Sequence, residues 1–186
     1  MPRSGLVRPV LAILLTLAIA RGALGQDHDV PYFPTPQPAV EKMLEMAGIK
    51  SGDFLIDLGS GDGRIPITAA KRHGIRALGV DLDPALNEQA RAAAVRENVS
   101  DKVTFREQDL FDTDLSEATV ITLFLLGSVN MKLRPRLMAL KPGTRILSYG
   151  WSMGEWKPDA TAQIDGRTIH MWIVRGGATT SPSITD

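Results

Sequence analysis

The feature that most constrains the fold is an alternation of strand patterns with helix patterns along the chain. Short apolar runs of strand length alternate with longer segments whose apolar residues recur at helical spacing. The expected strands are residues 53–59, 75–81, 102–109, 119–126 and 144–150, and the expected helices are residues 39–48, 64–74, 84–98 and 128–143. Because strands joined through helices lie parallel, the sequence predicts an α/β, doubly wound (Rossmann-like) sheet.

The C-terminal part breaks this alternation with two consecutive strand patterns. Residues 161–176 contain strand patterns on both sides of the pair Asp165 and Gly166, which is typical of a tight hairpin turn. The predicted sheet is therefore seven-stranded and mostly parallel, with one antiparallel strand from this C-terminal hairpin. Pro135 lies inside the helix expected at residues 128–143 and is expected to interrupt it.

The first 25 residues have the composition of a secretory signal peptide. Two arginines precede an uncharged apolar run at residues 10–20, and small residues follow at Ala23 and Gly25, so cleavage is expected before Gln26. The apolar run is too short to span a bilayer comfortably. We therefore expect an exported, periplasmic or secreted protein that is not inserted in a membrane after cleavage. A retained leader would instead make the protein membrane-anchored or organellar.

The rest of the chain divides into three expected parts. Prolines at four positions of residues 26–38 favour an extended N-terminal arm. Residues 39–175 form the folded domain, and residues 176–186 are small and polar, which favours a disordered tail.

Composition excludes several functions. The chain has no cysteine, which excludes disulfides, thiol nucleophiles and cysteine metal sites, and its three histidines show no metal-ligand spacing. Residues 1–25 hold three of the 21 basic residues and no acid, so the mature chain has 18 basic and 21 acidic residues, a charge of about −3. This balance disfavours nucleic acid as a partner, and we expect a monomer without a metal.

A glycine-rich loop follows the first strand of the domain. In the stretch DLGSGDGR, residues 57–64, the glycines Gly59, Gly61 and Gly63 follow G-x-G-x-G spacing between a strand and a helix, where ligands approach the backbone. The dinucleotide fingerprint is G-x-G-x-x-G. Asp62 would repel a pyrophosphate, so the loop favours a cofactor with an ammonium or sulfonium group, such as S-adenosylmethionine, over a nicotinamide dinucleotide.

Two further acids end the second and third expected strands. The carboxylate of Asp81 can accept hydrogen bonds from both hydroxyls of a ribose, and Asp109 suits recognition of an adenine amino group. Asp83 precedes Pro84 and is better interpreted as a helix cap.

The motifs DLGSGDG, VDLD and EQDLF, in this order across residues 52–174, resemble those of class I S-adenosylmethionine-dependent methyltransferases. Together with PYFPTP before the first helix, they are similar to the family of the lysine methyltransferases of the mitochondrial ATP synthase c subunit and the adenine nucleotide translocase, with bacterial relatives. The resemblance implies methyl transfer to a protein amine, that of lysine. The cofactor-binding residues that it implies are Tyr32, Thr35, Asp57, Gly59, Ser60, Gly61, Asp62, Gly63, Asp81, Leu82, Asp109 and Leu110.

The methyl acceptor is less clearly indicated by the sequence. Methyl transfer needs alignment of the two reactants and exclusion of water, not a nucleophilic side chain, so no catalytic residue is predicted. The aromatic candidates for the acceptor site are Phe124, Tyr149, Trp151 and Trp156. The alternative interpretation is that these side chains belong to the core. The segment after the fourth strand lacks the Asp/Asn-Pro-Pro-Tyr/Phe signature, which disfavours adenine or glutamine as acceptor. The alternative function is an exported, non-catalytic module that keeps the fold and binds a nucleoside or a protein.

Overall fold

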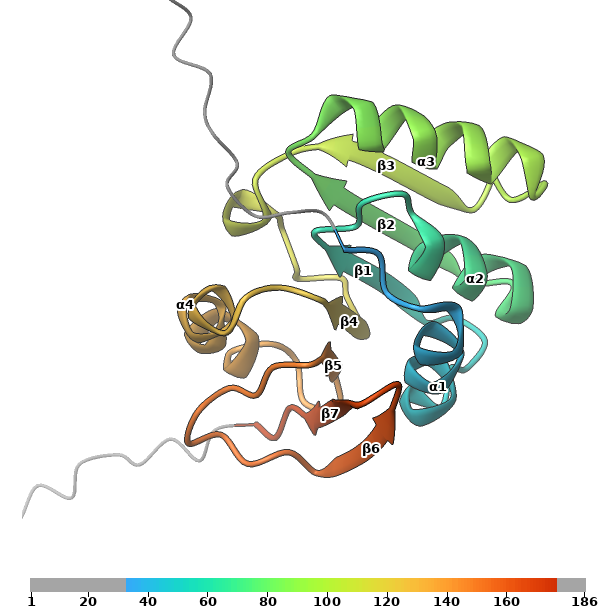
Figure 1. Cartoon of the computed structure of the whole chain (residues 1–186). Coiled ribbons are helices and arrows are strands. Elements are labelled where there is room, and N and C mark those ends of the chain that lie inside the picture. The colour runs from blue at the N-terminus through green and yellow to red at the C-terminus, as the bar shows by residue number, and fades with distance from the viewer. Residues whose placement is uncertain (1–32, 177–186) are drawn as a thin grey trace, which may run out of the picture. The chain divides into compact units, whose positions relative to one another are not determined.

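The structure is a computed structural model that describes residues 33–176, and its centre is one seven-stranded sheet (Figure 1). The strands are β1 (Phe54–Leu58), β2 (Arg76–Asp81), β3 (Val103–Glu107), β4 (Val120–Leu123), β5 (Arg145–Tyr149), β6 (Ala160–Ile164) and β7 (Arg167–Ile173). Their order is β3-β2-β1-β4-β5-β7-β6, and the first five pair in parallel. β7 pairs antiparallel with both β5 and β6, which confirms the predicted sheet.

The helices are α1 (Gln37–Ala47), α2 (Arg64–His73), α3 (Pro84–Arg96), the 3-10 helix η1 (Leu110–Asp112) and α4 (Gly127–Met138). Helix α1 begins two residues before the predicted start at Ala39. The extended backbone of Pro36 caps it, and Pro38 lies in its first turn, where a missing N–H leaves no hydrogen bond unmade. The boundary between the predicted arm and the first helix therefore lies at Pro36 rather than at Pro38.

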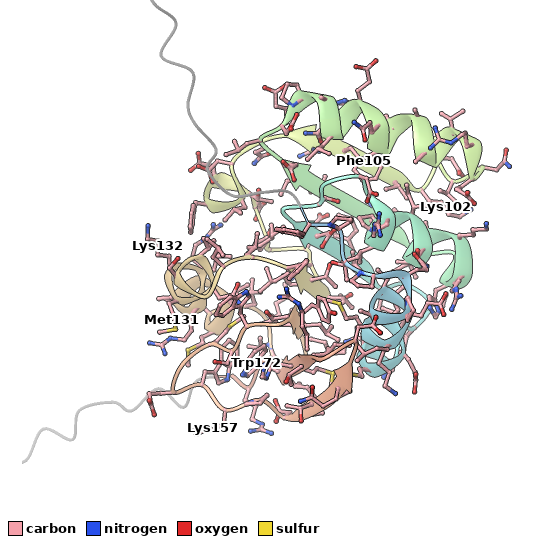
Figure 2. The ribbon with its side chains drawn as sticks, in the orientation of Figure 1. Lys102, Phe105, Met131, Lys132, Lys157 and Trp172 are labelled. Atoms are coloured by element: carbon pink, nitrogen blue, oxygen red, sulfur yellow. The ribbon has the colours of Figure 1, made fainter. Side chains whose placement is uncertain are left out.

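The two faces of the sheet are covered unequally. Helices α1, α2 and α3 pack on one face, where Phe105 is 6% exposed, while α4 and the loop at residues 150–158 cover the other, where Trp172 is fully buried (Figure 2). Both faces of the central strands are thus in a core, which explains why β4 is apolar and buried at every position.

Helix α4 runs unbroken through Pro135, so the predicted interruption is wrong. Pro135 lies on the exposed side of the helix and only one turn before its end, so its ring meets solvent and few hydrogen bonds are lost. Leu133 and Leu137, both fully buried, hold this segment against the sheet. Burial of the apolar stripe therefore outweighs the proline.

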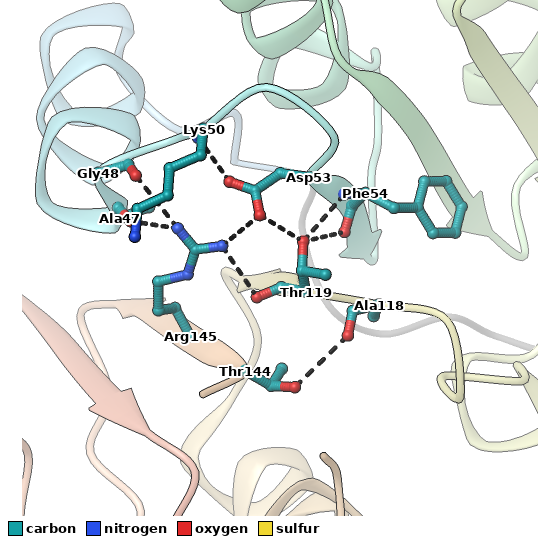
Figure 3. Close-up of polar contacts among 9 residues, drawn as sticks. All are labelled: Ala47, Gly48, Lys50, Asp53, Phe54, Ala118, Thr119, Thr144 and Arg145. Atoms are coloured by element: carbon teal, nitrogen blue, oxygen red, sulfur yellow. Dashed lines mark hydrogen bonds and ion pairs between the residues drawn. The ribbon is translucent and has the colours of Figure 1, made fainter. Parts of the chain in front are cut away.

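A polar network ties the amino ends of three strands to α1 (Figure 3). The guanidinium of Arg145 forms an ion pair with Asp53 and donates to the carbonyl of Ala47 at 2.8 Å. Asp53 also accepts from the Thr119 hydroxyl at 2.8 Å. Burial acts to raise the pKa of Asp53, but the hydrogen bonds from Arg145, Lys50 and Thr119 outweigh it and lower that pKa.

The C-terminal hairpin turns at Asp165 and Gly166, with φ of 48° and 73°. Two consecutive residues with positive φ are typical of the type I′ turn that the Asp-Gly pair predicts. The predicted signal peptide at residues 1–25, Tyr32 of the arm, and the tail from residue 177 lie outside the described residues. Within residues 33–176, no helix has the length and hydropathy needed to cross a bilayer, and no group of side chains is arranged to hold a metal ion.

Candidate active site

The glycine loop joins the carboxyl end of β1 to the first turn of α2. All three glycines have left-handed backbones, with φ of 75° at Gly59, 54° at Gly61 and 78° at Gly63. A Cβ at Gly59 would lie 2.6 Å from Leu125, and one at Gly63 would lie 2.4 Å from Phe105. Gly63 is therefore required by packing against Phe105 and Ala90, while at Gly59 the left-handed backbone is the stronger reason for glycine, in addition to any approach of a ligand.

Asp81, at the end of β2, is oriented by the loop. The Gly61 N–H donates to its Oδ2 at 2.8 Å, and the Asp83 N–H donates to its Oδ1 at 3.0 Å. Each carboxylate oxygen keeps a further acceptor site, so the pair of oxygens can still receive two hydroxyl groups. The Asp83 carboxylate accepts from the Ala85 and Leu86 N–H groups and caps α3, which confirms the prediction for that residue.

Asp109 does not end a strand, in contrast to the prediction. β3 ends at Glu107, and the Asp109 Oδ1 accepts from the Phe111 N–H at 2.8 Å, which caps the 3-10 helix η1. A local cap can therefore explain this carboxylate. Its Oδ2 makes no hydrogen bond within residues 33–176, so recognition of an adenine amino group, with Leu110 beside it, stays a prediction.

Asp62 is joined to Arg64, a residue that the sequence reasoning missed. The Arg64 guanidinium donates to Asp62 at 2.6 and 2.9 Å, and its Nη1 donates to the backbone carbonyl of Thr35 at 2.9 Å. The charge of Asp62 is thus shared with a cation, which weakens the argument from like-charge repulsion against a pyrophosphate. Arg64 could have been noticed because a cation at the N-terminus of a helix is unfavourable with the helix dipole.

Asp57 lies beneath the loop and is 2% exposed. Burial raises the pKa of Asp57 to about 7, and the negative charges of Asp81 and Asp62 act in the same direction. The hydrogen bond that the Thr122 hydroxyl donates to Asp57 at 2.7 Å opposes this shift. The Ser60 hydroxyl lies near enough to Asp57 to lower this pKa as well. No hydrogen bond of good geometry joins the two side chains, and in the described part of the chain Ser60 Oγ is buried without a partner.

The predicted acceptor aromatics divide between core and surface. The Tyr149 ring is 1% exposed and meets Phe124 edge to face, with ring centroids 5.0 Å apart, so Tyr149 is a core residue; burial raises its pKa. Trp151 is 43% exposed, and its ring packs against Gly127, the first residue of α4. Trp156 is partly buried and its carbonyl accepts from the Trp172 indole.

Asn130 fixes the loop that carries Trp151. Its side-chain amide donates to the Ser148 hydroxyl at 3.0 Å and to the Trp151 carbonyl at 3.4 Å. The residue is fully buried, and sequence reasoning did not select it. A polar side chain on the same helical stripe as Leu133 and Leu137 was the available signal.

Known proteins are similar to this chain in sequence and in fold. The family model described as the ANTKMT methyltransferase domain matches residues 57–160. A protein-lysine N-methyltransferase of Saccharolobus islandicus (strain REY15A) is 38% identical over 78% of this chain and 94% of its own. An adenine nucleotide translocase lysine N-methyltransferase of Mus musculus is 33% identical over 83% of this chain and 67% of its own.

Among solved structures, an RNA methyltransferase from Salinibacter ruber in complex with S-adenosyl-L-homocysteine is 50% identical, with a TM-score of 0.76, over 78% of this chain and 95% of its own. The fold, the glycine loop and these matches define an S-adenosylmethionine-dependent methyltransferase. Within that class, the chain belongs to the ANTKMT methyltransferase domain family.

The residues present fit this cofactor. The oriented Asp81 carboxylate offers hydrogen-bond acceptors for a polar sugar. Leu82 and Phe111, which are 45% and 37% exposed, offer apolar surface for a base. The buried Ser60 hydroxyl has hydrogen-bonding capacity left for a ligand. When bound, S-adenosylmethionine supplies a methyl group on a positively charged sulfur.

Proposed function

We propose that this chain methylates the side-chain amine of lysine in a protein. The observation that carries the proposal is the 38% identity to a protein-lysine N-methyltransferase across 94% of that protein. The segment after β4, Phe-Leu-Leu-Gly at residues 124–127, is consistent with it because it lacks the polar signature that holds a planar amide or base.

An apolar and cationic acceptor side suits this reaction. A lysine amine reacts only when neutral, and deprotonating it at pH 7 costs about 4 to 5 kcal/mol from an ordinary pKa of about 10.4. Phe124 and Gly150 follow β4 and β5, and the Arg167 guanidinium lies 5.5 Å from the Phe124 ring centroid. A cation in an apolar setting lowers the pKa of an incoming amine, so these residues would favour the reactive form.

The direct test is the identity of the methylated residue. Wild-type protein and Asp81→Ala are incubated with methyl-labelled S-adenosylmethionine and a cell extract, and labelled material is hydrolysed and separated. We expect label in methyllysine with the wild type and almost none with the variant. Label that is released by ribonuclease, or found in another amino acid, would contradict the proposal. The ribonuclease arm is needed because the similar Salinibacter ruber protein is an RNA methyltransferase by name.

We also propose that residues 1–25 direct export and are then removed, and that the mature protein is a monomer. The composition of the leader supports this, with basic residues before an apolar run and small residues before Gln26. N-terminal sequencing of protein recovered from cells is expected to begin at Gln26, and light scattering is expected to give one chain per particle. A start at Met1 would contradict the first part, and a dimer mass would contradict the second.

A further inference from the structure

Helix α4 presents apolar side chains on two opposite sides. Its buried stripe contains Leu133 and Leu137, as a helix on a sheet requires. The opposite side, at positions i, i+4 and i+7, carries Met131, Pro135 and Met138, all of them exposed. Met131 is 39% and Met138 is 49% exposed. Within residues 33–176 this second apolar side stays largely exposed, and the loop that carries Gly154 touches it at Met131.

The apolar surface continues onto the neighbouring loop. Leu126, 42% exposed, precedes the helix, and the Trp151 ring lies 3.1 Å from the Cβ position of Gly127. The methyl end of Met131 approaches Gly154 of the same loop to 3.0 Å, measured to its Cβ position. We call the surface formed by Leu126, Met131, Pro135, Met138 and Trp151 the α4 face.

The segment that carries most of the α4 face is basic in sequence, although the described domain as a whole is neutral. Residues 33–176 contain 18 basic and 18 acidic residues, which is the total of 21 of each less the three basic and three acidic residues outside this range. Residues 124–141 contain four basic residues and no acidic one, but Arg136 and Lys141 lie near the Asp114 carboxylate, so Lys132 and Arg134 are the cations that this surface offers. None of the ion pairs within the described residues involves Lys132 or Arg134. Figure 2 shows Lys132 beside Met131 on this side of the molecule.

We infer that the α4 face docks on the surface of an anionic lipid bilayer. Exposed leucine, methionine and tryptophan flanked by cations are the side chains that interfacial binding uses: apolar groups enter the headgroup boundary and cations attract anionic lipids. The leader proposed for residues 1–25 would also bring the chain to a membrane, whether it is cleaved there or retained. RNA binding needs basic residues along the whole contact with the phosphate backbone. This domain is neutral and has only a local group of cations, which suits a lipid surface better than RNA.

This docking would turn the acceptor side toward the membrane. The first turn of α4 begins three residues after Phe124, and Trp151 lies two residues after the end of β5, so the α4 face adjoins the carboxyl ends of β4 and β5. Acceptors at the bilayer surface would then be favoured by proximity. The inference concerns a surface and does not depend on which group is methylated.

Tryptophan fluorescence tests the inference on the full chain. All three tryptophans lie at or after residue 151, and Trp151 is the exposed one, so the emission reports this surface and not the leader. We expect a blue shift with phosphatidylglycerol vesicles, none with phosphatidylcholine alone, and reversal by high salt. Trp151→Phe should remove the shift. Sedimentation with anionic vesicles without any shift would overturn the inference, since the leader alone would then be bound.

The double variant Met131→Ser/Lys132→Glu tests the two contributions together. The charge reversal alone should raise the lipid concentration for half-maximal shift about thirtyfold, at ~1 kcal/mol per charge near the surface. The matched control is Val95→Ser/Lys102→Glu. In Figure 2, Lys102 lies at the edge of the molecule opposite to Met131 and Lys132, and Val95 is 63% exposed. The control should behave as wild type. An equal loss in both variants, or quenching by RNA without a response to vesicles, would overturn the inference.

Discussion

At the scale of single residues, three carboxylates lie around the glycine loop and each has a different environment. Asp57 is buried with a raised pKa, Asp62 is paired with Arg64, and Asp81 is held by two backbone N–H groups. Only Asp81 combines a fixed orientation with acceptor sites left for hydroxyl groups. Asp81 is therefore the residue of the three that best suits the predicted ribose contact.

The raised pKa of Asp57 predicts a pH-dependent stability. Folding raises this pKa from 3.8 to about 7, so the folded protein keeps a proton that the unfolded chain releases, and this contribution declines as pH rises from about 4 to 7. Asp57→Asn keeps an acceptor for Thr122 and removes the titration. The wild type should lose stability relative to the variant across this range, by about 4 kcal/mol at most. The measurement is the free energy of urea unfolding of both proteins as a function of pH. Parallel curves for the wild type and Asp57→Asn would contradict the prediction.

Arg64 is predicted to support cofactor binding indirectly. Arg64→Met removes the bonds to Asp62 and to the Thr35 carbonyl while keeping most of the apolar stem. Because these bonds hold the glycine loop against the segment at Thr35, the dissociation constant for S-adenosylhomocysteine should rise when they are lost. Arg72→Met, on the same helix and paired with Glu41 in solvent, is the control and should bind as wild type. Equal affinities of all three proteins would exclude this role.

Sequence reasoning reached single residues unevenly. It placed Asp81 at the end of a strand and Asp83 at a helix cap, and the structure confirms both positions, because a strand end and a residue before proline each have a local signature. Binding of the ribose by Asp81 stays a prediction. It missed the contact of Arg64 with the Thr35 carbonyl and that of Asn130 with Ser148, because these partners are 29 and 18 residues away in the chain. Contacts between distant segments depend on tertiary packing, which periodicity does not encode.

At the scale of elements, the amino ends of β1, β4 and β5 are joined to α1 by one buried ion pair. The side chains of Arg145 and Asp53 are 14% and 9% exposed, and Arg145 also satisfies carbonyls at the end of α1. Removing one partner leaves a buried charge without compensation. This junction should therefore contribute to stability and not to the chemistry, which lies at the opposite ends of the strands.

Arg145→Met is predicted to destabilise the fold by about 3 kcal/mol because Asp53 would remain charged and poorly solvated. The control is Arg76→Met, whose exposed guanidinium lies 5.1 Å from the Phe54 ring centroid and should contribute less than about 1 kcal/mol. Urea unfolding gives both values. Affinity for S-adenosylhomocysteine should be unchanged in folded Arg145→Met. A cost no larger than that of the control would show that the pair is not a structural junction.

Element types were predictable because periodicity and turn residues are local. The seven strands and the Asp-Gly hairpin follow from apolar runs and from positive φ. Element ends were less predictable. Pro135 did not end α4, since Leu133 and Leu137 are buried on the other side, and β3 ended before Asp109 because that residue caps η1.

At the scale of the whole molecule, the strand order places the glycine loop where the sheet changes direction. β1 lies between β2 and β4, so the chain builds outward to β3 on one side and to β5 on the other. Ligands of doubly wound sheets bind at this switch point, outside the carboxyl ends of the strands. The alternation of elements predicted such a sheet, and the matches to known methyltransferases identify the ligand that this family uses there.

The most direct test of the assigned cofactor site is calorimetric titration of the wild type and of Asp81→Ala with S-adenosylmethionine. We predict one binding site per chain in the wild type and an affinity at least about tenfold lower in the variant, since two charge-assisted hydrogen bonds to the ribose would be lost. Asp83→Ala is the control for helix capping, because that carboxylate bonds only its own helix within the described residues. No binding by the wild type at millimolar cofactor, or equal affinities of the wild type and Asp81→Ala, would contradict the assignment.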